Sequence, residues 1–353
     1  MSKTHHYKGR GATLSPDNRY SATQREPFDD GWHQDEQPER APTRLFVDSA
    51  KKIITYNQSP DVGFDRSINP YRGCEHGCVY CFARPTHAYL DLSPGLDFET
   101  QLFHKPDAPG LLIQELAKDN YRPAPVALGI NTDAYQPIER RLELTRRILA
   151  ILVEHKHPLT IVTKSALIER DIDLLAAAAE QHIAHVAVSI TTLDRDLSRR
   201  MEPRAAAPQR RLETVKRLTA AGIPVTVLIA PLIPVLNDSE LETLLDAACA
   251  AGAVDAGYVV LRLPHELDEM FVDWLQKHAP TKAEHVMSRI RDLRGGKNYE
   301  SAFGKRMRGT GVFADLVVKR FKVAYRKLGF PGGPALRSDL FIKPRLDGQM
   351  ELF

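Results

Sequence analysis

The sequence predicts an α/β fold, a partial (β/α)6 barrel of the TIM type with an irregular N-terminal arm and a basic, largely helical C-terminal extension. Six short apolar runs, typical of buried parallel strands, alternate with helix-like segments along the 353 residues. Six such repeats are too many for a small open sheet and too few for a closed eight-stranded barrel. The expected units are therefore the arm over residues 1–43, the barrel with an N-terminal hairpin over 44–285, and the extension over 286–353.

The strands are predicted from their composition and order. Residues 1–43 are polar and lack periodicity, so no regular element is expected there. Residues 44–57 are predicted to form a β-hairpin, with two apolar runs separated by polar residues. The six strands of the barrel follow and are apolar nearly throughout, as expected for strands covered on both faces, at 67–71, 126–131, 159–164, 185–190, 223–230 and 257–263.

Helix-like segments separate these strands, at 138–154, 170–182, 208–221 and 239–251. The third begins with Pro208 in its first turn and is followed by Gly222, which is the usual start and stop pattern. The active sites of parallel barrels lie at the carboxyl ends of the strands. We therefore expect ligand-binding groups directly after each predicted strand.

The charge of the chain is unevenly distributed. The net charge is only +3, but residues 289–345 carry 15 Lys and Arg against 4 Asp and Glu, a local excess of +11. Such a basic region can attract a polyanion such as nucleic acid, or it can be an ordinary solvated surface that contains arginine. No segment approaches the ~18 consecutive apolar residues of a membrane helix. The polar N-terminus does not have the apolar core of a secretory signal, so we expect a cytoplasmic protein with no membrane contact.

Three of the four cysteines lie within eight residues, in the segment YRGCEHGCVYCFARP. The spacing C-x3-C-x2-C predicts that Cys74, Cys78 and Cys81 are metal ligands. Three thiolates satisfy three irons of a [4Fe–4S] cluster and leave the fourth iron open. The alternative is zinc, with a fourth ligand from His76, His87 or His104, although no second pair of ligands is present. Cys249 stands in the middle of a predicted helix and is expected to be a small core residue.

The wider pattern resembles the radical S-adenosylmethionine (SAM) superfamily, and within it the spore photoproduct lyase-like family, also called DNA repair photolyase-like. The segments that carry this resemblance are NPYRGCEHGCVYCFAR, TDAYQPIE, TKS with RDIDLL, SITT, MEPRAAAPQRRL and APLIP. The resemblance implies a [4Fe–4S] cluster and SAM as cofactors, with reductive cleavage of SAM to a 5′-deoxyadenosyl radical. It also implies a reductase such as flavodoxin or ferredoxin as the electron donor.

The resemblance assigns roles to individual residues. Cys74, Cys78 and Cys81 match the cluster ligands, and Lys164 matches a lysine that contacts the methionine carboxylate of SAM. Ser189 matches a residue near the ribose. The remaining matches are Thr132 and Asp133, in the region that receives the methionine end, and the pair Glu202 and Arg211, around the cofactor or its support. Polar groups at strand ends are also common without function, and Asp133 could simply cap the following helix.

Two departures bear on the reaction. Spore photoproduct lyase uses a cysteine after the second strand, whereas the corresponding segment here, LGINTDAYQP (residues 128–137), contains none. The lyase also uses a tyrosine directly after the last cluster cysteine, where this chain has Phe82. The thymine-dimer lyase reaction of that enzyme is therefore not expected here. Three functions stay open, and no catalytic residue is assigned. The first is a radical SAM enzyme acting on nucleic acid, and the second is a radical SAM enzyme acting on a protein or small molecule. The third is a non-enzymatic metal-dependent nucleic-acid-binding protein.

Overall fold

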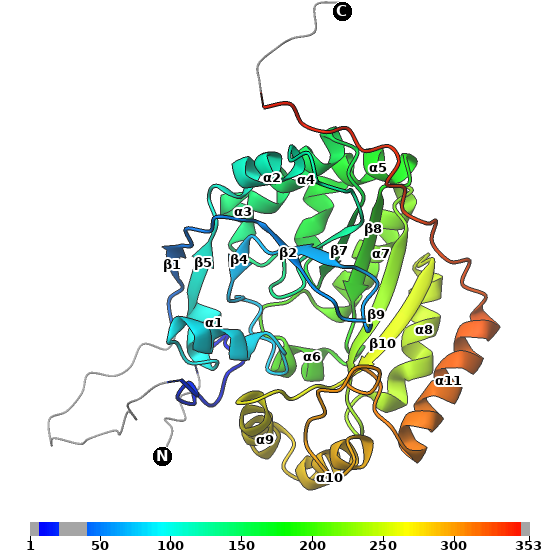
Figure 1. Ribbon diagram of the computed structural model, residues 1–353. Helices are drawn as coiled ribbons and strands as arrows, with labels where there is room; N and C mark the ends of the chain where they lie inside the picture. The colour runs from blue at the N-terminus through cyan, green and yellow to red at the C-terminus, as the bar shows by residue number, and fades with distance from the viewer. Residues whose placement is uncertain (1–6, 21–40, 347–353) are drawn as a thin grey trace, which may run out of the picture.

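A computed structural model describes residues 7–20 and 41–346 of the chain (Figure 1). Its main sheet has seven strands in the order β10-β9-β8-β7-β6-β3-β2. All neighbours pair in parallel except β2, which runs antiparallel to β3 at one edge. The strands are β2 (Ile54–Tyr56), β3 (Arg66–Ile68), β6 (Val126–Leu128), β7 (Leu159–Thr163), β8 (Ala184–Ser189), β9 (Val225–Leu232) and β10 (Asp255–Val260). The six predicted apolar runs are thus the six parallel strands of one sheet.

The predicted hairpin over residues 44–57 is wrong. Its first half, β1 (Arg44–Val47), pairs in parallel with β5 (Gln101–His104), which also pairs with β4 (Tyr71–Arg72) in a separate three-stranded sheet. Its second half, β2, pairs with β3 instead. The two halves belong to different sheets, because β1 has a distant partner and β2 pairs with the next strand along the chain.

The prediction that the strands are covered on both faces is wrong for four of them. Along β7, β8, β9 and β10, fully buried side chains alternate with partly accessible ones. The buried set lies beneath helices, which form one layer against the sheet (Figure 1). The accessible set, for example Val162, Ala187 and Leu228, lines the other face. The sheet therefore has one sealed face and one partly open face.

Each of the four predicted helical segments contains a helix, and further helices and 3-10 turns occur that were not predicted. The helices and 3-10 turns are η1 (Arg84–Leu90), α1 (Leu96–Thr100), α2 (Ala108–Leu116), α3 (Glu139–Leu142), α4 (Leu144–Glu154), η2 (Ala166–Asp171), α5 (Ile172–Glu180), α6 (Arg195–Met201), α7 (Pro208–Ala220), η3 (Asp238–Glu240), α8 (Leu241–Ala250), α9 (Leu267–His278), α10 (Ala283–Leu293) and α11 (Val312–Leu328). The predicted helix over 138–154 is broken at Glu143, whose φ of 51° is left-handed. The carboxylate of Glu139 accepts the Thr145 N–H at 3.0 Å, so α4 starts afresh there.

The C-terminal extension is less helical than predicted. Among residues 286–346, only α11 and the end of α10 are helical, and the predicted boundary at 285/286 falls inside α10. Residues 330–346 run as an extended strap past the amino ends of three strands (Figure 1). Backbone N–H groups of the strap donate to Val254 O, His182 O and His155 O, at 2.8, 2.9 and 2.9 Å. This strap covers the end of the sheet opposite to the strand carboxyl ends.

The edges of the sheet are linked across its open side. The loop between β2 and β3 carries Asp61, which accepts the Gly304 N–H at 2.7 Å and the Arg306 Nε–H at 2.5 Å. Gly304 and Arg306 belong to the segment after α10, which hydrogen-bonds to β10 through Val260 N and Met307 O at 2.8 Å. A flat seven-stranded sheet would hold its edges about 29 Å apart. The sheet therefore curls its two edges toward one another.

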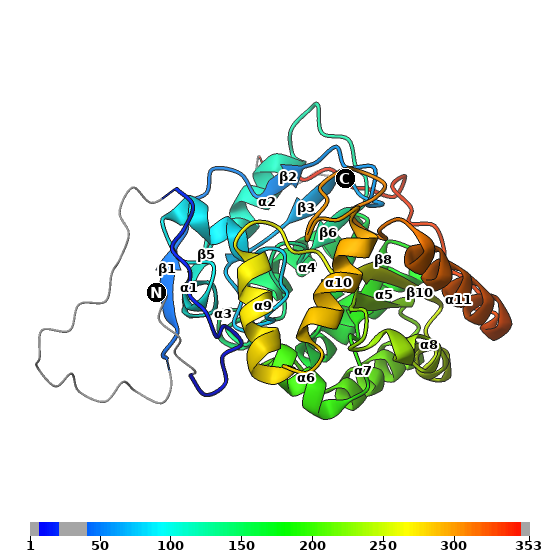
Figure 2. The ribbon, with the colours of Figure 1, turned by 90° about the horizontal axis from the view of Figure 1, so that it is seen from below.

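The described part of the N-terminal arm, residues 7–20, lies against α1 and α9 (Figure 2). Thr13 Oγ1 donates to Asp273 in α9 at 2.6 Å, and Arg19 forms an ion pair with Glu266 at 2.9 Å. The arm thus connects the start of the chain to helices that follow the last strand. Within residues 7–20 and 41–346, every helix is too short or too polar to traverse a bilayer.

Candidate active site

The three-cysteine loop follows β4 and lies at the carboxyl end of the parallel strands. Cys74 and Cys78 are buried and Cys81 is partly buried, and all three are free thiols. Burial raises the pKa of each of these thiols, and for Cys78 and Cys81 the charge of Lys164 acts in the opposite direction. Thiolates in such a place require a strong positive charge beside them, which a bound metal centre would supply.

A buried ion pair stabilises the cysteine loop. Arg84 and Glu99 are fully buried and pair at 2.5 Å. The Arg84 guanidinium also donates to the backbone oxygens of Cys78, Pro94 and Gly95 at 2.8, 3.1 and 2.9 Å. These bonds fix the backbone between the second and third cysteines. Such planar, multiply bonded pairs give geometric precision as well as free energy.

The N-terminal arm completes this support. Backbone N–H groups of Gly11 and Ala12 donate to the Glu99 carboxylate at 2.9 and 2.8 Å. Gly11 lies so close to Gly77 of the cysteine loop that a Cβ at residue 11 would stand 1.8 Å from the Gly77 carbonyl oxygen. Only glycine fits this contact. The arm therefore belongs to the wall of the site.

Replacing Gly77 with alanine should destabilise the cysteine loop. Gly77 has a φ of +67°, and an added Cβ would meet Glu99 Oε2 at 2.8 Å. We expect the free energy of unfolding to fall by at least about 2 kcal/mol, from the left-handed backbone and the displaced carboxylate together. Urea denaturation measures this. Gly110→Ala is the control: Gly110 lies in α2 with open space around it, and alanine should be neutral or stabilising there. Equal stability of the two variants would contradict the proposed packing of the loop.

Asp133, after β6, links the cysteine loop to the end of β7. Its carboxylate lies 3.2 Å from His76 Nδ1 and accepts hydrogen bonds from Thr163 Oγ1, the Lys164 N–H and the Tyr135 N–H at 2.7, 2.7 and 2.9 Å. Burial acts to raise the pKa of Asp133, but His76 and these donors lower it to about 2. The carboxylate is thus ionised and fully engaged with protein groups.

Lys164 and Ser189 lie side by side at the ends of β7 and β8. Lys164 Nζ donates to Ser189 Oγ at 2.8 Å, and Ser189 Oγ donates to Ala230 O at 3.0 Å. The Lys164 ammonium also lies 5.8 Å from the centre of the Tyr80 ring, within the cysteine loop. Burial lowers the pKa of Lys164. Across the described residues, no carboxylate forms an ion pair with this ammonium group. It is a cation without a protein counter-ion beside the cysteines.

Glu202 and Arg211 form a second buried ion pair. Glu202 also accepts hydrogen bonds from the hydroxyls of Tyr80 and Thr191. Arg211 donates to Ser189 O at 3.0 Å and to the Ala206 carbonyl at 2.7 Å. The pair therefore ties the cysteine loop, through Tyr80, to the end of the strand that carries Ser189.

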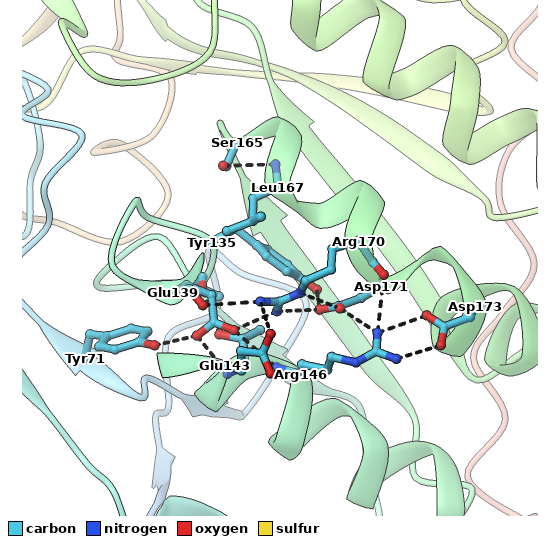
Figure 3. Close-up of polar contacts among 12 residues, drawn as sticks. Tyr71, Tyr135, Glu139, Glu143, Arg146, Ser165, Leu167, Arg170, Asp171 and Asp173 are labelled. Atoms are coloured by element: carbon cyan, nitrogen blue, oxygen red, sulfur yellow. Dashed lines mark hydrogen bonds and ion pairs between the residues drawn. The ribbon is translucent and has the colours of Figure 1, made fainter. Parts of the chain in front are cut away.

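A polar network lies beneath the loops that follow β6 and β7 (Figure 3). Glu139 is fully buried and accepts hydrogen bonds from Tyr71 and, at 2.8 Å, from Arg170. The Thr132 hydroxyl donates to the Tyr71 carbonyl at 3.2 Å. The network thus extends from β4, which precedes the cysteines, to the loop that carries Thr132.

Asp171 is the second buried carboxylate of this network (Figure 3). It accepts hydrogen bonds from Tyr135 and Arg146 at 3.0 and 2.8 Å, and from Arg170 at 2.8 Å. Asp171 ends η2, which begins just after Lys164. The motifs TDAYQPIE and RDID thus hold the strand-end loops in place. Burial is the main cause that raises the pKa of the Cys74 thiol, and of the charged groups in these motifs Asp133 lies close enough to contribute.

The zinc alternative finds no matching ligand set. Among the described residues, no three His, Cys, Asp or Glu side chains gather closely enough to hold one metal ion. The candidate fourth ligand His76 contacts Asp133, and His87 Nε2 lies 3.0 Å from Gln101 O. Cys249 is partly buried in α8, where its Sγ lies 3.8 Å from the carbonyl of Leu328. The fourth cysteine is therefore remote from the other three.

Sequence reasoning missed several residues of this site. Gln136 bridges the cysteine loop by accepting the Glu75 N–H at 2.9 Å and donating to Gly73 O at 3.1 Å. The pair Arg84 and Glu99 was missed as well. Their signal was weak, because they bond mainly to backbone atoms, which leave no residue-type pattern in the sequence. The residues that the sequence singled out do come together: Cys74, Cys78, Cys81, Asp133, Lys164, Ser189, Glu202 and Arg211 lie on connected loops at one end of the sheet.

The fold and this loop define an α/β enzyme with three thiols at the carboxyl end of a parallel sheet. The chain belongs to the radical SAM superfamily, whose family model matches residues 68–248. Enzymes of this superfamily use a [4Fe–4S] cluster and SAM. The chain is thus a radical SAM enzyme; the predicted family and cofactors are confirmed, and the non-enzymatic alternative is wrong.

Relatives and solved structures are similar over most of the chain. It is 41% identical over 232 residues to an uncharacterized protein of Mycobacterium tuberculosis (strain ATCC 25618 / H37Rv), covering 65% of this chain and 67% of that one. An uncharacterized protein of Methanocaldococcus jannaschii is 30% identical over 191 residues, or 54% and 68% of the chains. Among solved structures, spore photoproduct lyase complexed with dinucleoside spore photoproduct gives a TM-score of 0.57 at 15% identity, over 82% and 80% of the chains. The predicted likeness of fold to spore photoproduct lyase is confirmed.

Proposed function

We propose that Cys74, Cys78 and Cys81 hold a [4Fe–4S] cluster, with SAM bound at the open iron, and that the curved sheet is the partial (β/α)6 barrel around them. When bound, the two cofactors supply reductive cleavage of SAM to a 5′-deoxyadenosyl radical. The residues fit the cluster in chemistry, since three thiols from one loop leave one iron without a protein ligand. The loop is held from behind by the buried pair Arg84 and Glu99.

The observation that carries this proposal is the unpaired ammonium group of Lys164 beside the cysteines. An anion bound there would pair with this ammonium group, and the methionine carboxylate of SAM has the matching chemistry. Ser189 adds a hydroxyl next to the ammonium group, suited to the polar part of the same ligand. Thr132 and Asp133 shape the loop that faces it, since Asp133 holds the backbone of Lys164. Glu202 and Arg211 support the wall through Tyr80 and Ser189.

Replacing Lys164 with methionine should therefore weaken the binding of SAM and spare the cluster. Loss of a charge-assisted bond to a carboxylate is expected to raise the dissociation constant of SAM about tenfold or more. Equilibrium binding of radiolabelled SAM to the reconstituted, unreduced protein measures this, and iron content is measured on the same sample.

Lys216→Met is the control for the Lys164 variant, because Lys216 is exposed on α7. It should bind SAM as the wild type does. A Lys164→Met protein with a full cluster and unchanged affinity for SAM would remove Lys164 from the site.

We further propose that the substrate is a nucleic acid. Two observations support this: the excess of +11 charges over residues 289–345, and the likeness of fold to a lyase solved with a dinucleoside. The reaction differs from that of the lyase, since Phe82 has no hydroxyl and residues 128–137 contain no cysteine. A reductase such as flavodoxin or ferredoxin would donate the electron.

Binding of nucleic acid through the basic region should fall steeply with salt. Titration of a labelled single-stranded oligonucleotide at two salt concentrations tests the substrate class. If no salt-sensitive binding is found and a protein or metabolite stimulates SAM cleavage, the substrate is that class of molecule and not a nucleic acid.

A further inference from the structure

Arg262 follows β10 at the carboxyl end of the sheet and has almost no protein partner. Its Nε is buried without a hydrogen-bond partner, and NH1 reaches only Met307 Sδ, at 3.8 Å. No carboxylate pairs with Arg262 in the described ranges 7–20 and 41–346. A part-buried guanidinium without an acceptor is unfavourable, and binding an anion would supply the missing acceptor.

The flat face of Arg262 lies over Phe82, with its Cζ 5.1 Å from the centre of the ring. Phe82 directly follows Cys81, and 41% of its surface is exposed. A large exposed aromatic ring next to a ligand cysteine has no packing role on its uncovered side. It offers a flat apolar surface within one residue of the proposed cluster.

The surroundings of Arg262 are positively charged. Arg294, 3% exposed, donates to Leu261 O and Lys305 O at 2.7 and 2.9 Å and also has no ion pair within the described part of the chain. The carboxylate of Asp61 lies near Arg262, but it already forms an ion pair with Arg306 at 2.5 Å. These arginines follow β10 and α10, where the segment after α10 meets the loop between β2 and β3. An anion entering by this open side would be attracted to Arg262.

We propose that Arg262 and Phe82 form a substrate subsite that binds one phosphate and the adjoining base of a nucleotide. Arginine binds phosphate in a bidentate manner, and an exposed aromatic ring stacks on any base. Phosphate and base together are supplied by a single-stranded nucleic acid or by a free nucleotide. This inference rests on the proposed function, and it places the substrate against the cysteine loop at Phe82.

The test uses the full chain, reconstituted with its cluster and with SAM present. The probe is a fluorescently labelled 12-nucleotide oligothymidylate, followed by anisotropy over a series of salt concentrations, with free thymidine monophosphate as competitor. The variants are Arg262→Gln and Phe82→Leu. Arg147→Gln, exposed on α4, is the control with the same change of charge.

Arg262→Gln should weaken binding of the oligonucleotide about tenfold and reduce the salt slope by about one. Phe82→Leu should weaken it about fivefold or more without changing the slope, since stacking releases no counterions. Arg147→Gln should stay within about twofold of the wild type. If thymidine monophosphate competes with the oligonucleotide in the wild type and no longer competes in Arg262→Gln, the ligand of the subsite is a free nucleotide. If only the oligonucleotide binds, the ligand is a single-stranded nucleic acid.

Wild-type affinity and slope in Arg262→Gln would overturn the subsite, as would a wild-type protein that binds neither probe. If Arg262→Gln loads no cluster, Arg262→Lys replaces it: the slope should be kept and the affinity should fall. Unchanged affinity in that variant and in Phe82→Leu would also overturn the proposal. Formation of 5′-deoxyadenosine by the wild type is measured alongside. If it forms while the probes fail to bind, the subsite alone is wrong; if it does not form, the proposed function is wrong.

Discussion

Replacing Cys78 with alanine is expected to abolish assembly of the [4Fe–4S] cluster. Two thiolates leave a second iron without a protein ligand, and the Cys78 carbonyl that would remain is already bonded to Arg84 at 2.8 Å. Iron should fall from about four per chain to near zero after anaerobic reconstitution. Iron analysis and the visible absorption of the cluster measure this directly.

Cys249→Ala is the matched control for the cysteine variant. Cys249 lies in α8 and contacts the carbonyl of Leu328 at the end of α11, remote from the other three cysteines. Its replacement removes a thiol without removing a proposed ligand, so iron content should equal that of the wild type. Full iron in Cys78→Ala, or loss of iron in Cys249→Ala, would contradict the assignment of ligands.

Replacing Arg211 with methionine is expected to lower the free energy of unfolding by about 3–5 kcal/mol. The change would leave Glu202, 2% exposed, as a buried carboxylate without its cation. It would also leave the carbonyls of Ser189 and Ala206 without donors. Urea denaturation of the cluster-free protein measures the loss without any contribution from cofactors.

Arg217→Met, on the same helix, separates burial from charge. Arg217 pairs with Glu169 and Glu213, but its side chain is 54% exposed. Exposed pairs contribute at most about 1 kcal/mol, so this variant should be close to the wild type. The double variant Arg211→Met with Glu202→Gln should recover part of the lost stability, because no unpaired charge remains. Equally small losses of unfolding free energy in Arg211→Met and Arg217→Met would show that the buried pair does not hold the site together.

The parallel strands were predictable because each has a local signature. Runs such as residues 159–164 and 185–190 are apolar and bounded by polar ends, and α7 has a proline at its start and a glycine after its end. The pairing of β1 was not predictable. Its partner β5 lies more than fifty residues away, and neither is longer than four residues. Short strands carry too little pattern to identify a distant partner.

The site divides in the same way. The cysteines, Lys164 and Ser189 could be found because their spacing and their place after strands are local features. The contact of residues 9–12 with Glu99 could not, since it depends on one buried carboxylate reached by two backbone N–H groups. The free guanidinium of Arg262 was equally hidden, because the absence of a partner is visible only in three dimensions.

The most direct test of this account is anaerobic reconstitution followed by reduction with dithionite in the presence of SAM. Iron is counted, and 5′-deoxyadenosine is identified by mass spectrometry. We expect about four irons per chain and formation of 5′-deoxyadenosine by the wild type, with neither in Cys78→Ala. Zinc in place of iron, or a full cluster that never yields 5′-deoxyadenosine, would contradict it.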